Sequence, residues 1–439
     1  MQNDTILGFT NVSRVQHWQL LAVIVALAVT TVAFHARTLR SLDDAPTAPA
    51  RAWAVYGNTI QWNDTDQFAE YLEASANALR TGRIYFPVSE YDCPISFLVP
   101  CGVIRIVTGW PPIRIMNLFA IVSTFLSGIA AYLLFRKFDA RIGPAFVAAV
   151  GYQTANFTVY SHQQGHMQYI QFAWMPMAIS ALLTLLRQSS RWRPALWLGL
   201  VMGGLILTSP SWTLYLGYVA LPVFALTYIL AAHRSKIIAE VGRLLIRGGL
   251  AVAVTVVVAA FYLIPRMNNL PRHFPRPLSD VFAFVLYDPS LLVDSAHPML
   301  FLGWPLIIVG IFAVVWWRQN RTPELNAVVA TGLAAFVMMF PARFGMPYWL
   351  FWKFAPMGDH LRVPARFFPI FLIMLLTLIS VYLSRRWASS WKPAACLFTA
   401  LALGNWLASP WLIGFDLYAA LDGVGRRLQS ITGWNLGVT

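Results

Sequence analysis

The sequence predicts an all-α polytopic membrane protein. Of its 439 residues, 58% are hydrophobic and only 11% are charged, whereas a soluble domain usually has about 25% charged residues. Apolar runs of membrane-spanning length recur along the chain, and none of them contains an acidic residue. The net charge of +14 would suggest a nucleic-acid partner in a soluble protein, but cytoplasmic loops rich in Lys and Arg explain it here. We therefore expect one transmembrane domain over residues 1–439, surrounded by membrane lipids and without nucleic acid.

The first elements are a span followed by a long polar loop. The apolar run 18–34 has no small-residue cleavage site behind it, so we interpret it as a retained anchor. Residues 35–112 are expected to form the first outer loop. Within the loop, 68–79 has apolar residues at helical spacing, and 94–107 is apolar but short and contains Arg105. Both segments are predicted to be amphipathic helices at the membrane interface.

The rest of the chain is predicted to alternate spans with short connections. With the first run, the expected total is about eleven transmembrane helices. The division between the fifth and sixth of them, at Ser209-Pro210-Ser211, leaves room only for a minimal hairpin. The runs after the first loop are 113–135, 144–160, 169–186, 195–207, 212–232, 248–264, 299–317, 326–340, 367–383 and 393–413.

The distribution of charge predicts the orientation. With the N-terminus in the cytoplasm, the cytoplasmic loops receive half of the Lys and Arg residues but only four acids: Asp4, Asp139, Glu240 and Glu324. This bias places the N-terminus inside. The long segments 35–112, 265–298 and 341–366 then lie on the outer face, where we expect the functional site.

Two aspartates in the first outer loop are the leading candidates for chemistry. Asp64 and Asp66 lie in Trp62-Asn-Asp-Thr-Asp-Gln-Phe68, directly before the predicted helix 68–79. A carboxylate here can accept a proton from an attacking hydroxyl. A pair of aspartates can also bind a divalent metal, although two acids without further ligands make a poor metal site. Asp92, two residues after Glu90, is a secondary candidate with the same two interpretations.

Arginines of the last outer loop are candidates for binding an anion. Arg362 and Arg366 are four residues apart and directly precede the span at 367–383. Two guanidinium groups at the membrane surface suit a phosphate or pyrophosphate. The alternatives are interfacial snorkelling and pairing with Asp359.

Two histidines and three cysteines add little evidence for a metal. His162 and His166 have the spacing of zinc ligands on a helix, but Gly165 weakens the helix and no third ligand is nearby. Hydrogen bonds to a polar substrate, or to the end of a span, are the other interpretation. Cys93 and Cys101 would be about 12 Å apart along a helix, too far for a disulfide.

The order of these features resembles the C-type (GT-C) membrane glycosyltransferase superfamily, whose members use polyprenyl-phosphate sugars. It is most similar to the YfhO-like bacterial membrane proteins. The resemblance rests on the single span before a long outer loop, on Asp64-x-x-Gln67-Phe68, on Arg114 at the start of the next span, and on Arg362-Val-Pro-Ala-Arg366-Phe. Two features of relatives are missing: a paired Asp-Glu, and a large outer domain after the last span.

The resemblance implies a glycosyltransferase at the periplasmic face of a bacterial inner membrane. It implies that Asp64, with Asp66 as the alternate, is the catalytic base, and that Arg362, Arg366 and Arg114 bind the donor phosphate. Gln67, Asp92, His162 and His166 are then expected to contact substrate. The expected reaction inverts the anomeric centre and requires no cofactor, a divalent metal being possible but not favoured.

Two other functions compete with this interpretation. An O-antigen polymerase or ligase also has many spans and outer arginines, but uses a lipid pyrophosphate. A lipid or glycan transporter (flippase) usually has ionisable residues at the centre of its spans and repeated halves. Neither feature is visible in this sequence.

Overall fold

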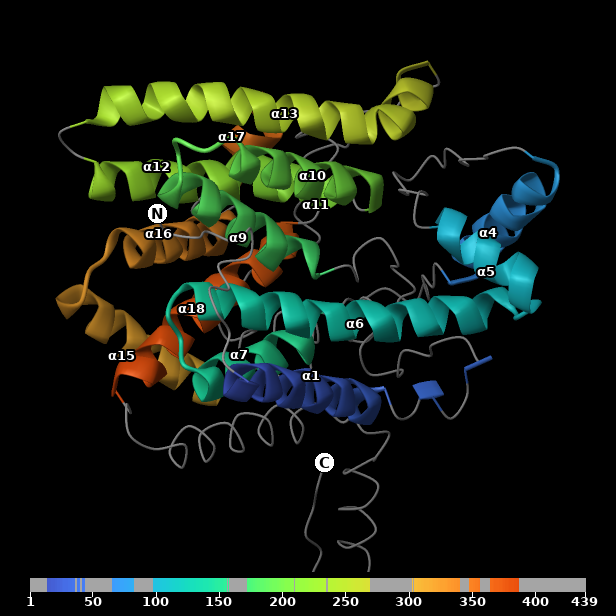
Figure 1. Cartoon of the computed structure of the whole chain (residues 1–439), viewed down its shortest axis with the longest axis horizontal. Helices are drawn as coiled ribbons and strands as arrows, with labels where there is room; N and C mark the ends of the chain where they lie inside the picture. The colour runs from blue at the N-terminus through green and yellow to red at the C-terminus, as the bar shows by residue number, and fades with distance from the viewer. Residues whose placement is uncertain are drawn as a thin grey trace, which may run out of the picture.

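The computed structural model describes residues 14–35, 38–39, 42–43, 65–82, 98–155, 157, 172–208, 210–233, 236–268, 302, 304–339, 347–355 and 364–386. All regular secondary structure in these ranges is helical (Figure 1). This confirms the predicted all-α class. The expected span 393–413 lies outside the described residues.

Five segments among the described residues are long and apolar enough to cross a membrane: His17–Phe34, Pro112–Lys137, Trp212–Ala232, Ile237–Ala260 and Pro364–Arg386. The first two are α1 (Arg14–Phe34) and α6 (Pro112–Lys137). The third joins α11 (Pro210–Tyr215), a π-helical turn η2 (Leu216–Ala220) and α12 (Leu221–Ala232). The last two contain α13 (Ile237–Asn268), and the short helix η5 (Pro364–Phe367) with α18 (Phe368–Arg386). Four of them coincide with predicted apolar runs, and Ile237–Ala260 overlaps the run 248–264 but begins eleven residues earlier. The chain is therefore a helical membrane protein.

Five other predicted spans appear as helices of 12 to 16 residues among the described ranges. They are α7 (Ile142–Gln153), α9 (Trp174–Arg187), α10 (Arg193–Thr208), α15 (Trp304–Gln319) and α16 (Pro323–Met338). At 1.5 Å per residue, a 16-residue helix such as α10 is about 24 Å long, against about 30 Å for the hydrocarbon core. The count of about eleven full-length spans is therefore not confirmed by the residues that the structure describes.

The basic ends of several helices meet at one end of the bundle. The Arg187 guanidinium donates a 3.0 Å hydrogen bond to the Lys137 carbonyl and lies 3.3 Å from Glu324, which joins the end of α9 to the end of α6 and the start of α16. The backbone N–H of Arg141 donates to the Ser384 hydroxyl at 2.8 Å, so α18 also ends there. These contacts bring together charged residues that the charge pattern assigned to one face.

Helices α4 (Thr65–Arg80) and α5 (Leu98–Thr108) lie at the other end, beside the start of α6 (Figure 1). Because α18 ends at the basic end and has the length of a span, its N-terminal extension η5 also points away from that end. The structure thus places the start of α6 and the helices α4 and α5 at the end of the bundle away from the basic loops, and η5 at the end of α18 that points away from them (Figure 1).

The centre of the bundle is α18. In the segment that η5 and α18 form, 83% of the most apolar 18-residue stretch is buried inside the protein. It packs against α7, α15 and α16. A polar seam joins α1 to α6 and α7: the Gln153 amide donates to the Leu27 carbonyl at 3.1 Å and to the Thr31 hydroxyl at 2.6 Å, and the His35 ring lies 3.0 Å from the Thr124 hydroxyl. These bonds pair buried polar groups across helix interfaces, although the Gln153 Oε1 atom has no hydrogen-bond partner among the described residues.

Helix α13 is peripheral, since only 6% of the most apolar 18-residue stretch within Ile237–Ala260 is buried inside the protein. It packs mainly on α10, at the edge of the bundle (Figure 1). Glycines on α10 permit the close approach: a Cβ at Gly199 would lie 2.6 Å from the Ala251 carbonyl oxygen, and one at Gly203 would lie 2.6 Å from the Val258 Cβ. Small residues have the same role at other interfaces between membrane helices.

We expect Gly199→Ala to destabilise the protein, because the new methyl group meets backbone that cannot rotate away. Overpacking of this kind costs about 1–3 kcal/mol. Gly242→Ala is the control, since a Cβ there meets nothing within 4 Å and removing a helical glycine stabilises by about 1 kcal/mol. The measurement is the midpoint of thermal unfolding in detergent. Equal midpoints for the two variants would contradict the interpretation of this interface.

Candidate active site

The helix that bears the candidate aspartates begins earlier than predicted. Helix α4 starts at Thr65, not at residue 68, so Asp66 and Gln67 belong to its first turn rather than to the loop before it. The structure describes only the backbone of these two residues. Asp64 directly precedes the first described residue of the helix. The carboxylates are therefore attached at, or one residue before, a helix N-terminus, where the helix dipole favours negative charge.

The apolar stripe of α4 packs on protein rather than on the membrane surface, which corrects our prediction. Leu72 and Ala76 are fully buried, and Leu72 shares a hydrophobic cluster with Cys101 of α5 and with Ile115 of α6. At Gly102, a Cβ would lie 3.1 Å from Leu79 and 3.3 Å from the Ala76 nitrogen, so the two helices approach closely there. Helix α4 is thus fixed by α5 and α6.

Burial also decides the role of Cys101, a free cysteine. Desolvation raises the pKa of its thiol to about 12, so it remains protonated at neutral pH and is not a nucleophile. Its predicted lack of a disulfide with Cys93 stays a prediction, because Cys93 lies outside the described residues.

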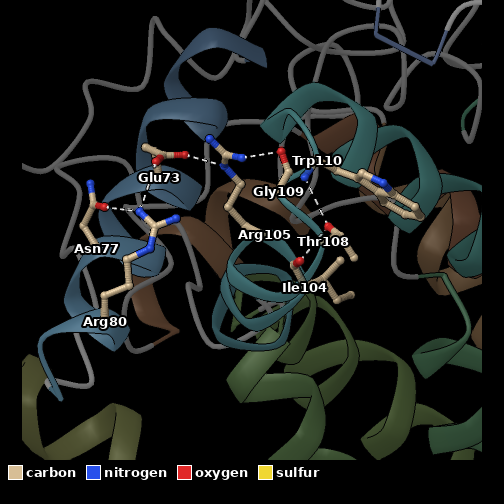
Figure 2. A network of polar contacts seen from close by, with 8 residues as sticks. All are labelled: Glu73, Asn77, Arg80, Ile104, Arg105, Thr108, Gly109 and Trp110. Carbon is tan, nitrogen blue, oxygen red and sulfur yellow. Dashed lines mark hydrogen bonds and ion pairs between the residues drawn. The ribbon is translucent and has the colours of Figure 1, made fainter.

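A polar network locks α4 to α5 and to the turn before α6 (Figure 2). The Arg105 Nε donates to Glu73 at 2.8 Å, and its Nη1 donates to the Gly109 carbonyl at 2.6 Å. Arg80 binds the Asn77 side chain at 2.8 Å and lies 3.9 Å from the Glu73 carboxylate. Gly109 has φ +69°, a conformation that glycine adopts without strain. Arg105 therefore serves to orient α4, and its charge is neutralised by Glu73.

Arg114, a predicted phosphate ligand, is paired with a carboxylate. Its Nε and Nη2 donate to the two oxygens of Asp43 at 2.8 and 2.6 Å, and its guanidinium lies 5.8 Å from the centre of the Trp110 ring. Asn117 holds the same segment by donating to the Leu42 carbonyl at 2.9 Å. A phosphate could reach the fork of Arg114 only by displacing Asp43. Sequence reasoning missed Asp43; its only signal was a further acidic pair, with Asp44, in the first outer loop.

The Asp43–Arg114 pair predicts a dependence of stability on pH. The hydrogen bond from Arg114, with its positive charge, lowers the pKa of Asp43 in the folded protein. A lowered pKa contributes stability that is present above the usual value of about 4 and is lost as the pH falls through the folded value. Wild type should therefore unfold at a higher temperature than Asp43→Asn at pH 7, and the difference should vanish in acid. A difference that grows on acidification would contradict the pairing.

Arg366 lies in η5, above a group of buried aromatic rings. The Phe367 ring lies 4.9 Å from Tyr215 of α11 and 6.3 Å from Tyr348 of α17 (Pro347–Phe354), measured between ring centres. Both tyrosines are fully buried, and they are hydrogen-bonded to each other. Burial raises the pKa of Tyr348 well above its usual value, and the nearby Arg366 cation opposes that rise. The arginine is thus held within electrostatic reach of a tyrosine pair that its sequence neighbours do not reveal.

The remaining predicted site residues lie outside the described residues: Asp64, Asp92, His162, His166 and Arg362. Helix α4 and the start of α6, which carries Arg114, lie at the end of the bundle away from the basic loops, and η5 precedes α18, whose other end lies among those loops (Figure 1). Across the described ranges, no three His, Cys, Asp or Glu side chains are grouped as metal ligands would be. Comparison of the chain with protein-family models and with curated proteins finds no match.

Proposed function

We propose that the protein is a membrane glycosyltransferase that moves a sugar from a polyprenyl-phosphate donor to a glycan or lipid acceptor of the cell envelope. Two features support the proposal: the start of α4, at the end of the bundle away from the basic loops, and η5, at the end of α18 that points away from those loops (Figure 1). The first carries Asp66 and follows Asp64, and the second carries Arg366. A carboxylate and a guanidinium on one face of a membrane are the two charges that this transfer needs.

In the proposed reaction, the acceptor hydroxyl gives its proton to Asp64 as its oxygen attacks the anomeric carbon of the donor. The bond from that carbon to the phosphate oxygen breaks, and the polyprenyl phosphate leaves with the electron pair. Arg366 and Arg362 stabilise the negative charge that develops on the phosphate. Attack opposite the leaving group inverts the anomeric centre. Each proton and charge is then accounted for by the chain's own residues.

Orientation follows from the same division of charge. Because loops rich in Lys and Arg stay in the cytoplasm, the face with α4 and η5 is the periplasmic face of a bacterial inner membrane. Spans that surround this face would hold the polyprenyl tail in lipid while its phosphate stays at the surface. Asp64 and Arg366 would then meet the sugar and the phosphate on either side of the bond that breaks.

The test is transfer of radiolabelled sugar by the purified full-length protein in lipid nanodiscs. A polyprenyl-phosphate sugar should label an added cell-envelope fraction, with the product inverted at the anomeric carbon. Use of a polyprenyl-pyrophosphate glycan alone would favour the polymerase or ligase. Movement of the intact donor across a vesicle membrane, with no bond broken, would favour the transporter.

A further inference from the structure

Helix α5 is apolar on two opposite sides. One side, with Cys101 and Gly102, packs against α4 and α6. On the other side, Val103, Ile104 and Val107 are 47%, 41% and 78% exposed, and Trp110 just beyond the helix is 38% exposed. Residues three and four apart lie on the same side of a helix, so the three aliphatic side chains form one stripe. We refer to Val103, Ile104, Val107 and Trp110 as the α5 ridge.

Cations beside the ridge have their charges neutralised within the protein. Arg105 donates to Glu73 and to the Gly109 carbonyl, and Arg114 is paired with both oxygens of Asp43. Figure 2 shows the Arg105 head group turned toward α4, where the Glu73 carboxylate receives it. Among the described residues beside the ridge, Arg105 and Arg114 thus leave no charge unpaired, and the ridge is suited to an uncharged apolar medium.

Helix α4 differs from α5 at its exposed positions. Its apolar stripe is buried by packing on α5, and its exposed residues include Glu70, Asn77 and Arg80. The exposed side of α4 is thus polar, and the exposed side of α5 is aliphatic. The two helices form two layers, in which α5 lies between α4 and the medium that covers the ridge.

The helix that follows the α5 ridge in the sequence indicates which medium covers the ridge. Helix α6, a membrane-spanning candidate, begins at Pro112, two residues beyond Trp110. Its own exposed residues include Val122 and Leu126, which face lipid if α6 spans the membrane. The ridge is thus joined directly to the start of a span that itself exposes apolar side chains, and Trp110, at that junction, has the position of an interfacial anchor.

We propose that the α5 ridge is immersed in the acyl chains of the outer leaflet, and that α4 rests on α5 at the level of the lipid head groups. The axes of packed helices are about 8–10 Å apart, so α4 stands about one helix layer above the acyl region. If the proposed function holds, this layer places the start of α4 level with the phosphate and sugar of a lipid-linked donor. The immersion itself does not depend on that function.

Photocrosslinking distinguishes acyl chains from other occupants. Val107 is replaced by p-benzoyl-phenylalanine in the full-length protein, which is reconstituted in nanodiscs of phosphatidylethanolamine and phosphatidylglycerol and irradiated. Glu70, exposed on α4, is replaced in the same way as the control. We expect a mass increase of one phospholipid at Val107 and none at Glu70. Val103 is a second position on the ridge, to be used if the Val107 variant does not insert.

Three other results would overturn the proposal. A crosslink to another peptide of the same chain would show that a further segment covers the ridge, and a crosslinked dimer would show that a second copy does. The absence of any adduct at Val103 and Val107 would place the ridge in water. A lipid adduct in a protein that transfers no sugar would uphold the immersion and remove only the proposed function.

Discussion

Asp64→Asn is expected to lower the rate of sugar transfer by at least about 100-fold, the low end of what a positioned general base contributes. Asparagine keeps the shape and volume of the side chain but cannot accept the proton of the acceptor hydroxyl. Because the change removes a transition-state function, kcat should fall while the KM for the donor changes little. The measurement is a time course of transfer from labelled polyprenyl-phosphate sugar in nanodiscs.

Asp66→Asn is the matched control for this prediction. The structure places Asp66 in the first turn of α4, so its replacement tests the same helix end with a change of the same size. If Asp66→Asn is the inactive variant, the base is displaced by two residues and the mechanism stands. A fully active Asp64→Asn/Asp66→Asn double variant would exclude this loop from the chemistry.

Chelation separates the base from a metal ligand. Two aspartates without a third ligand bind Mg²⁺ or Mn²⁺ poorly, so treatment with EDTA should leave the activity of the wild type largely unchanged. An enzyme that is silenced by EDTA and restored by added metal would convert both aspartates from base to ligand. That result would also require further ligands from other parts of the chain.

Long uninterrupted apolar runs were the most predictable part of the fold. The runs at 18–34 and 113–135 appear as α1 and α6 because nothing in them breaks a helix. Prediction was less exact at the start of α13. This helix begins at Ile237, eleven residues before the predicted run 248–264, because the charged residues Glu240, Arg243 and Arg247 excluded 237–247 from an apolar run although the segment is helical. The division at Ser209-Pro210-Ser211 agrees with the structure, in which α10 ends at Thr208 and α11 starts at Pro210.

The first outer loop shows what periodicity cannot decide. The spacing of Leu72 and Ala76 correctly predicted a helix with one apolar side. It could not say whether that side contacts lipid or protein, because both media accept the same residues. The structure shows α5 and α6 there instead of lipid. Likewise, the fork of Arg114 suits a phosphate and a carboxylate equally, and only tertiary structure shows that Asp43 occupies it.

The arginines of the last outer segment are the second place where we expect a large effect. Arg366→Ala should lower kcat/KM for the donor by about 10- to 150-fold, because a hydrogen bond to a charged group contributes about 1.5–3 kcal/mol. Arg362→Ala should act in the same direction. Arg366→Lys keeps the charge but not the two-pronged geometry, so it should recover only part of the loss.

Arg321→Ala is the control, since this arginine lies at the basic end, over the Trp317 ring at 5.3 Å. It should leave kcat/KM unchanged.

Arg366 is held near the buried Tyr348–Tyr215 pair, so a loss of activity in Arg366→Ala could arise from repacking rather than from the phosphate. Tyr348→Phe separates these causes, because it removes the hydroxyl and keeps the ring that packs near Phe367. If Arg366 acts on the phosphate, Arg366→Ala should weaken donor binding at an unchanged unfolding midpoint, and Tyr348→Phe should act more mildly through the position of the guanidinium. Full activity in both Arg362→Ala and Arg366→Ala, at normal expression, would make these arginines interfacial anchors and leave the leaving group without its predicted ligand.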